Sequence, residues 1–75
     1  GIRVSPNPAS PGTNLRISAL RSISFMRLYQ PDGKLMLEHK FSSFQKEALF
    51  TLPQLPPGIY WMETESGCAK LAIER

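Results

Sequence analysis

Proline is distributed along this chain so that few uninterrupted segments are long enough for a helix. The seven prolines lie at positions 6, 8, 11, 31, 53, 56 and 57 of the 75 residues. A proline inside a helix removes one backbone hydrogen bond and clashes with the preceding turn. Between the prolines, apolar and polar residues alternate, which is the periodicity of a half-buried strand. The sequence therefore predicts an all-β fold without a convincing helix.

Seven short segments carry this strand pattern, and turn residues separate them. The pair Asp32-Gly33, for example, readily adopts the positive φ angles of a tight hairpin turn. The segment 42–46 is polar and predicted to be a loop, although 41–49 could instead form one or two helical turns. About seven short antiparallel strands favour a small Ig-like β-sandwich, with a small barrel as the alternative. The predicted strands are 2–4, 14–18, 23–29, 34–41, 48–52, 59–64 and 68–74.

The predicted core takes the inward face of these strands. A chain of this length forms one domain, residues 1–75. Its single cysteine excludes an internal disulfide, so packing of the hydrophobic residues (41% of the chain) must stabilise it. Truncating a buried Phe50 to alanine is expected to cost about 3–5 kcal/mol. The expected core residues are Leu15, Ile17, Met26, Leu28, Leu35, Leu37, Phe50, Leu52, Tyr60, Leu71 and Ile73.

The charge of the chain is moderately basic, with a net charge of +3 and an isoelectric point near 9.4. The lysines and arginines are dispersed and form no run or cluster typical of a nucleic-acid-binding surface. We therefore predict no nucleic-acid partner, and a small nucleic-acid-binding barrel is the least favoured alternative. No segment approaches the roughly 20 apolar residues of a membrane-spanning helix.

Residues that could carry catalysis or bind a metal are few and scattered. His39 is the only histidine and Cys68 the only cysteine, whereas a metal site needs several such ligands. Cys68 could act as a nucleophile only beside an oriented base, and the sequence indicates none. The six carboxylates form no clear acid–base pair, and there is no glycine-rich phosphate loop. We therefore predict a chain that is not an enzyme and holds no metal or cofactor, with His39 on a solvated surface.

Four short motifs follow one another along the chain. In this order and at this spacing they resemble the C-terminal sorting domain of the type IX secretion system, over essentially the whole length. The chain departs from the family pattern at Ser5, where the family has tyrosine, at Gln30, where it has aspartate, and at Arg75, where it has lysine. The motifs are Val4-Ser5-Pro6-Asn7-Pro8-Ala9-Ser10, Leu28-Tyr29-Gln30-Pro31-Asp32-Gly33-Lys34, Leu55-Pro56-Pro57-Gly58-Ile59-Tyr60 and Lys70-Leu71-Ala72-Ile73-Glu74-Arg75.

Each motif taken alone also has a purely structural interpretation. The two prolines around Asn7 would fix a stiff turn in which the asparagine bonds its own backbone. Gly58 would permit a bend, and Tyr60 and Trp61 would pack with their polar tips near the surface. Only the ordered set of motifs is specific. The sorting-motif residues that the resemblance implies are Pro6, Asn7, Pro8, Asp32, Gly33, Lys34, Gly58, Ile59, Tyr60, Lys70, Leu71, Ile73 and Arg75.

The resemblance also implies a function as an export signal that is not itself catalytic. Such a domain follows a cargo protein, crosses the periplasm, and docks on an outer-membrane translocon and a shuttle protein. A sortase-like peptidase then commonly removes it, and the cargo stays at the cell surface or is secreted. We expect segment 70–75 to be an open edge strand whose basic ends meet an acidic partner. The alternative is a small Ig-like accessory module that binds carbohydrate or protein for adhesion, because a fold does not fix a function.

Overall fold

The chain forms one antiparallel sheet of five strands in the computed structural model, which describes residues 1–75 except for the side chain of Ser43. The prediction of an antiparallel all-β fold is confirmed. The Ig-like sandwich is not confirmed, because hydrogen bonding joins all five strands into one curled sheet. Among the described residues there is no helix that is long and apolar enough to cross a membrane. The strands are β1 (Ile2–Ser5), β2 (Asn14–Tyr29), β3 (Leu35–Thr51), β4 (Gly58–Thr64) and β5 (Gly67–Ile73).

The two long strands, β2 and β3, bend together at one corner. The pairing moves from Ser18↔Glu47 to Ile23↔Gln45 and then to Phe25↔Lys40, so extra residues bulge first from β2 and then from β3. Such bulges let a strand turn a corner while it stays paired. All seven predicted segments are extended, but the count of seven strands is wrong because the corner joins four of them into two. The predicted loop 42–46 and the alternative helical turn at 41–49 are also wrong, since both lie within β3.

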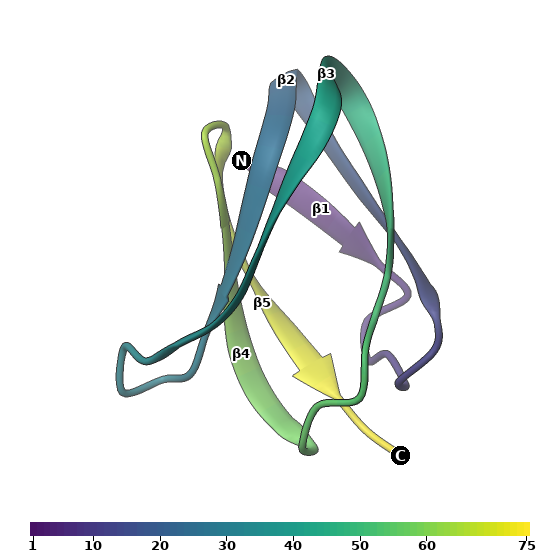
Figure 1. Ribbon diagram of the computed structural model, residues 1–75, viewed down its shortest axis with the longest axis vertical. Helices are drawn as coiled ribbons and strands as arrows, with labels where there is room; N and C mark the ends of the chain where they lie inside the picture. The colour runs from purple at the N-terminus through teal and green to yellow at the C-terminus, as the bar shows by residue number, and fades with distance from the viewer.

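The corner divides the sheet into two arms that face each other (Figure 1). The first arm consists of β1 and the halves of β2 and β3 at residues 14–18 and 47–51. The second arm consists of the other halves, 23–29 and 35–40, followed by β4 and β5. Among the described residues, β3 pairs with β2 only, whereas β1 and β4 share the opposite side of β2. The N-terminus lies beside the β4–β5 turn, and the C-terminus lies toward the other end of the molecule (Figure 1).

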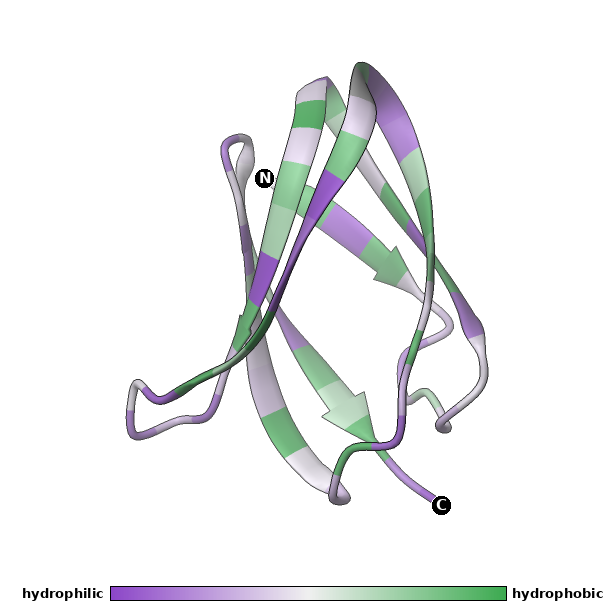
Figure 2. Cartoon of the chain, viewed as in Figure 1, coloured by the Kyte–Doolittle hydropathy of each residue, from purple (hydrophilic) through white to green (hydrophobic). Residues whose placement is uncertain are grey.

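The core lies between the two arms and confirms most of the predicted inward residues. Figure 2 shows hydrophobic and hydrophilic residues alternating along the strands, as a sheet with one buried face requires. Ala9, Ile23, Ala48 and Met62 are also buried and were not among the predicted core residues. Met62 follows Tyr60 by two residues on β4, so strand alternation places it on the same inward face as the predicted Tyr60. The buried hydrophobic residues are Ala9, Leu15, Ile17, Ile23, Met26, Leu28, Ala48, Leu52, Tyr60, Met62, Leu71 and Ile73.

Leu35 corrects the prediction, because its side chain is 48% exposed. A shift in register between Leu28↔Leu37 and Tyr29↔Leu35 leaves one extra residue on β3, so Leu35 does not continue the inward face of Leu37. Leu37 and Phe50 are only partly buried and pack against the rim of the core. Phe50→Ala should therefore cost less than the about 3–5 kcal/mol that removes a fully buried ring.

Candidate functional site

The side chain of Asn7 bonds the last strand of the sheet in the way that a neighbouring strand would. Its Nδ2 donates to the carbonyl oxygen of Lys70 at 2.8 Å, and its Oδ1 accepts from the backbone N–H of Ala72 at 3.0 Å. Both peptide bonds preceding Pro6 and Pro8 are cis. The prediction that Asn7 bonds its own backbone is wrong. The first motif is therefore hydrogen-bonded to the last one.

Ala9 continues this contact along the same edge of β5. The N–H of Ala9 donates to the carbonyl of Ala72 at 2.9 Å, and its own carbonyl accepts from the N–H of Glu74 at 2.8 Å. These bonds form a parallel bridge between Ala9 and Ile73. We name the contacts of Asn7 and Ala9 with β5 the terminal clasp. Because the clasp occupies backbone groups of residues 70, 72 and 74, the expectation that this segment is an open edge is wrong.

Replacing Asn7 with alanine is expected to loosen the end of β5. The change removes two hydrogen bonds, each worth about 0.5–1.5 kcal/mol, so the free energy of unfolding should fall by about 1–3 kcal/mol. The N–H of Ala72 should also exchange faster with solvent, because it loses its acceptor. Asn14→Ala is the matched control, since Asn14 only accepts one exposed hydrogen bond from Thr51. If exchange at Ala72 is unchanged in Asn7→Ala, the clasp does not hold the strand.

The central motif forms the tight turn between β2 and β3. The N–H of Gln30 donates to the carbonyl of Lys34 at 2.8 Å, and the N–H of Gly33 donates to the carbonyl of Gln30 at 2.9 Å. Asp32 accepts from the N–H of Lys34 at 3.0 Å, and Gly33 has a φ angle of 92°, which favours glycine. Asp32 and Gly33 therefore shape this turn, and they leave the Lys34 side chain exposed.

The late motif fixes the start of β4. Gly58 has a φ angle of 150°, and the Tyr60 hydroxyl donates to the carbonyl of Pro56 at 2.6 Å. Tyr60 is only 3% exposed, so its ring belongs to the core and its hydroxyl locks the preceding loop. The central and late motifs meet, because residues 30–32 and 56–60 line one open hollow of about 400 Å³.

The terminal motif divides into buried and exposed residues along β5. Leu71 and Ile73 lie in the core, whereas Lys70 and Arg75 are exposed. The Lys70 ammonium lies 5.9 Å from the centre of the Trp61 ring, within the range of a cation–π contact. Arg75 lines a second hollow of about 480 Å³ together with Pro11 and residues 54–57.

All four motifs lie toward one end of the molecule, with the Pro-Asn-Pro turn and the turn at 31–34 on opposite sides of it (Figure 1). This end contains the Pro-Asn-Pro turn at 6–8, the turn at 31–34, the loop at 53–58 and the C-terminal residues. We name it the motif end. The corner of β2 and β3, the β4–β5 turn and the first residue of the chain lie toward the opposite end (Figure 1).

Comparison with known protein families agrees with the motifs. A family model described as the secretion system C-terminal sorting domain matches residues 3–74. The chain belongs to this family of type IX secretion sorting domains. The match includes every sorting-motif residue except Arg75. A comparison with curated proteins and another with solved structures each found no significant match.

The structure of this sorting domain separates its motif residues by exposure. Tyr60, Leu71 and Ile73 are buried, and Asn7, Asp32 and Gly33 are exposed but hydrogen-bonded within the clasp or the central turn. The remaining motif side chains are exposed, and they form no hydrogen bond that stabilises a turn or the clasp. They are those of Pro6, Pro8, Lys34, Ile59, Lys70 and Arg75.

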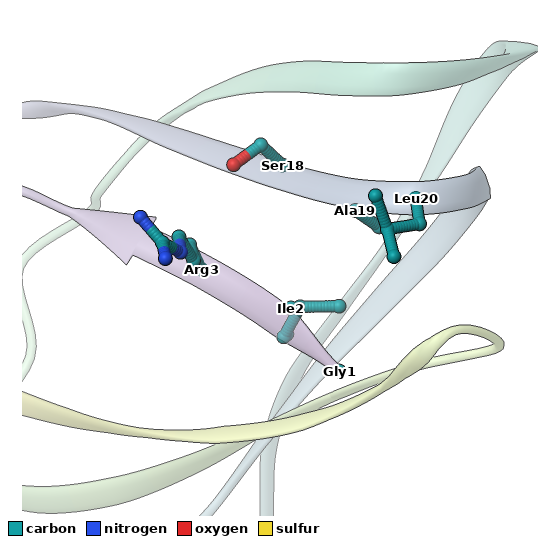
Figure 3. Close-up of a pocket in the computed structure, with 6 residues that line it drawn as sticks. All are labelled: Gly1, Ile2, Arg3, Ser18, Ala19 and Leu20. Carbon is teal, nitrogen blue, oxygen red and sulfur yellow. The ribbon is translucent and has the colours of Figure 1, made fainter.

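The hollow in Figure 3 lies outside the motif end. Its volume is about 480 Å³, and it lies between β1 and the start of the corner in β2. Arg3 is the only charged side chain among its lining residues, and none of them is a sorting-motif residue. The lining residues are Gly1, Ile2, Arg3, Ser18, Ala19 and Leu20.

The carboxylates of the second arm lie in structural ion pairs and hydrogen bonds. The Arg27 guanidinium donates to Glu38 at 2.5 Å and to Glu63 at 3.3 Å. The hydrogen bond to Glu38, and to a smaller extent the one to Glu63, raises the pKa of Arg27. The bond between Arg27 and Glu38 also lowers the pKa of the Glu38 carboxyl. Both groups are solvent-exposed, so water screens the pair and its effect on stability is small.

Glu65 forms a contact that the sequence did not indicate. Partial desolvation raises the pKa of its carboxyl, but hydrogen bonds from the hydroxyl and the backbone N–H of Ser24 outweigh it, so the pKa is lowered overall. The contact ties the β4–β5 turn to β2 just after the corner. His39 and Cys68 are exposed, and the His39 ring contacts the rings of Phe41 and Phe50 at centroid distances of 4.8 and 5.0 Å.

Proposed function

We propose that this sorting domain works as a non-catalytic address that other components of the secretion system read on the folded chain. Residues 1–75 form a single domain that follows a cargo domain. The domain folds in the periplasm and brings the cargo to a shuttle protein and the outer-membrane translocon. A sortase-like peptidase then separates it from the cargo, which remains at the cell surface or is released.

The observation that carries this proposal is the assembly of distant motifs at one end of the molecule. Asn7 and Ala9 hold a strand more than sixty residues away, with separations of 63 and 65 residues for the two Asn7 bonds. The motif end therefore exists only when the chain is folded. A partner that binds the motif end therefore distinguishes folded sorting domains from unfolded ones, and it can do so without contacting the cargo.

We propose that the exposed motif side chains make the contacts and that the others build the surface. Lys70 and Arg75 would present positive charge to an acidic partner, and complementary charges favour orientation and fast association. Pro6, Pro8 and Ile59 would add apolar contact, and Lys34 would supply a third positive charge. Asn7, Asp32, Gly33, Gly58, Tyr60, Leu71 and Ile73 act through the backbone and the core.

One observation favours a second candidate, an adhesion module. Trp61 is 42% exposed on β4, in register with Tyr29 on β2 and Lys70 on β5. An exposed aromatic face can stack on a sugar ring and hydrogen-bond at its edges. Saturable glycan binding that Trp61→Ala abolishes would support this candidate.

The proposal is tested by fusing the chain to the C-terminus of a secreted reporter in a bacterium with a type IX system. We expect the reporter to reach the cell surface or the medium only when the translocon is intact and the chain is attached. The matched controls are the reporter alone and the same fusion in a strain without the translocon. Surface delivery that is equal in both strains, or a fusion that stays in the periplasm of the intact strain, would refute the proposal.

A further inference from the structure

The edge of β3 contrasts with the clasped edge of β5. Among the described residues, β3 pairs with β2 along one side and has no strand on its other side. An unpaired edge presents a row of N–H and C=O groups to which another chain can add a strand. The half of β3 in the second arm, residues 35–40, is about as long as an ordinary strand of five to six residues. We name this segment the open edge.

The open edge carries an excess of positive charge. Lys34 and Lys40 stand at its two ends, and both side chains are exposed. Neither is among the ion pairs formed by the described side chains. Glu38, the carboxylate within the segment, is already paired with Arg27 on β2 at 2.5 Å. A strand that approaches this edge therefore meets two positive charges and a neutralised acid.

The open edge also carries exposed apolar surface. Leu35, the first residue of the open edge, is 48% exposed. Lysines on an edge strand can also serve to discourage unwanted pairing. If the lysines served only to prevent pairing with other chains, a leucine exposed beside Lys34 would work against them, because exposed apolar surface promotes association.

We propose that the open edge binds an extended acidic segment of a partner protein by strand addition. The backbone of the segment pairs with the outward N–H and C=O groups of residues 35–40, and its carboxylates face Lys34 and Lys40. An apolar side chain of the segment covers Leu35. This surface does not include Lys70 and Arg75. It shares Lys34 with the motif end, so Lys40 is the lysine that belongs to the open edge alone. The binding test below uses a peptide and does not depend on which partner reads the motif end.

The test uses two synthetic peptides and the full chain. The first peptide, Glu-Thr-Val-Thr-Val-Thr-Glu with blocked ends, places its carboxylates at the same spacing as Lys34 and Lys40. The second peptide has lysine in place of both glutamates. We expect saturable binding of the acidic peptide only, measured by titration of backbone amide signals in NMR. Binding should slow hydrogen exchange at every second amide of residues 37–40, where β3 pairs regularly with β2, because strand pairing uses alternate backbone groups.

Charge variants locate the site. The double variant Lys34→Glu with Lys40→Glu should weaken binding of the acidic peptide roughly tenfold or more, because two attractions become repulsions. A control outside the open edge is Lys46→Glu, which reverses one lysine of β3 instead of two and should leave the affinity within about twofold. An unchanged amide spectrum away from the substitutions confirms that each variant is folded.

Several results would overturn the proposal. They are absence of saturable binding, equal binding of the basic peptide, protection of successive rather than alternate amides, and shifts centred on residues 70–75. An equal loss of affinity in Lys46→Glu would also overturn it, because the site would then lie on the other half of β3. None of these results bears on translocon-dependent export, so this proposal and the proposed function fail separately.

Discussion

Truncating Leu28 to alanine is expected to lower the free energy of unfolding by about 2–5 kcal/mol. Leu28 has no exposed surface and lies on β2 opposite both Leu37 of β3 and Met62 of β4. Removing its side chain leaves a cavity where three strands of the second arm meet. A domain of this size has a total stability of about 4–11 kcal/mol, at roughly 0.05–0.15 kcal/mol per residue. The single change should therefore remove a large share of that stability.

Chemical denaturation followed by circular dichroism measures this effect, and Leu20→Ala supplies the control. Leu20 also lies on β2, but its side chain is 89% exposed at the corner. The same chemical truncation there should change stability by no more than about 0.5 kcal/mol. If the two variants unfold at similar denaturant concentrations, the core does not lie between the two arms as described.

Much of the fold could be predicted from local sequence, because its turns have distinct chemistry. Asp32-Gly33 predicted the β2–β3 turn, and the φ angle of 92° at Gly33 explains why glycine is needed there. Alternation placed Leu15 and Ile17 on the buried face, where both have no exposed surface. These signals concern residues that are near one another in the chain, so one sequence is sufficient to interpret them.

The features that the sequence did not predict depend on contacts between distant residues. The corner joins two predicted strands into β2 without a proline or a tight turn, and only the pairing with β3 shows it. An asparagine between two prolines suggests a local turn, yet its partner is the backbone of residues 70 and 72. One extra residue in β3 moved Leu35 out of the core, and a register shift of this kind leaves no mark in the alternation.

The clasp changes how the basic end of the chain can be recognised. Because Asn7 and Ala9 bond the edge of β5 at residues 70, 72 and 74, a partner cannot add a strand there without displacing them. If a partner reads this end as proposed, it contacts exposed side chains, and Lys70 and Arg75 are the exposed cations of the terminal motif. Reversing both to glutamate should abolish most export. It should leave the fold nearly intact, because exposed charges contribute little to stability.

The double variant Lys70→Glu with Arg75→Glu can be compared with a second double variant, Arg3→Glu with Arg21→Glu. The second pair gives the same change of net charge on exposed residues outside the motif end. Equal melting temperatures and amide spectra would show that both variants retain the fold. The comparison then shows whether export depends on where the charges are reversed or only on the change in net charge.

The most direct test of the account is the rate at which a fused reporter reaches the cell surface in these two folded variants. We expect delivery to fall to near the level of a strain without the translocon for Lys70→Glu with Arg75→Glu. For the matched pair it should remain close to that of the unaltered chain. Delivery at the unaltered rate by the folded Lys70→Glu and Arg75→Glu variant would contradict the claim that the basic residues of the motif end are the recognised signal.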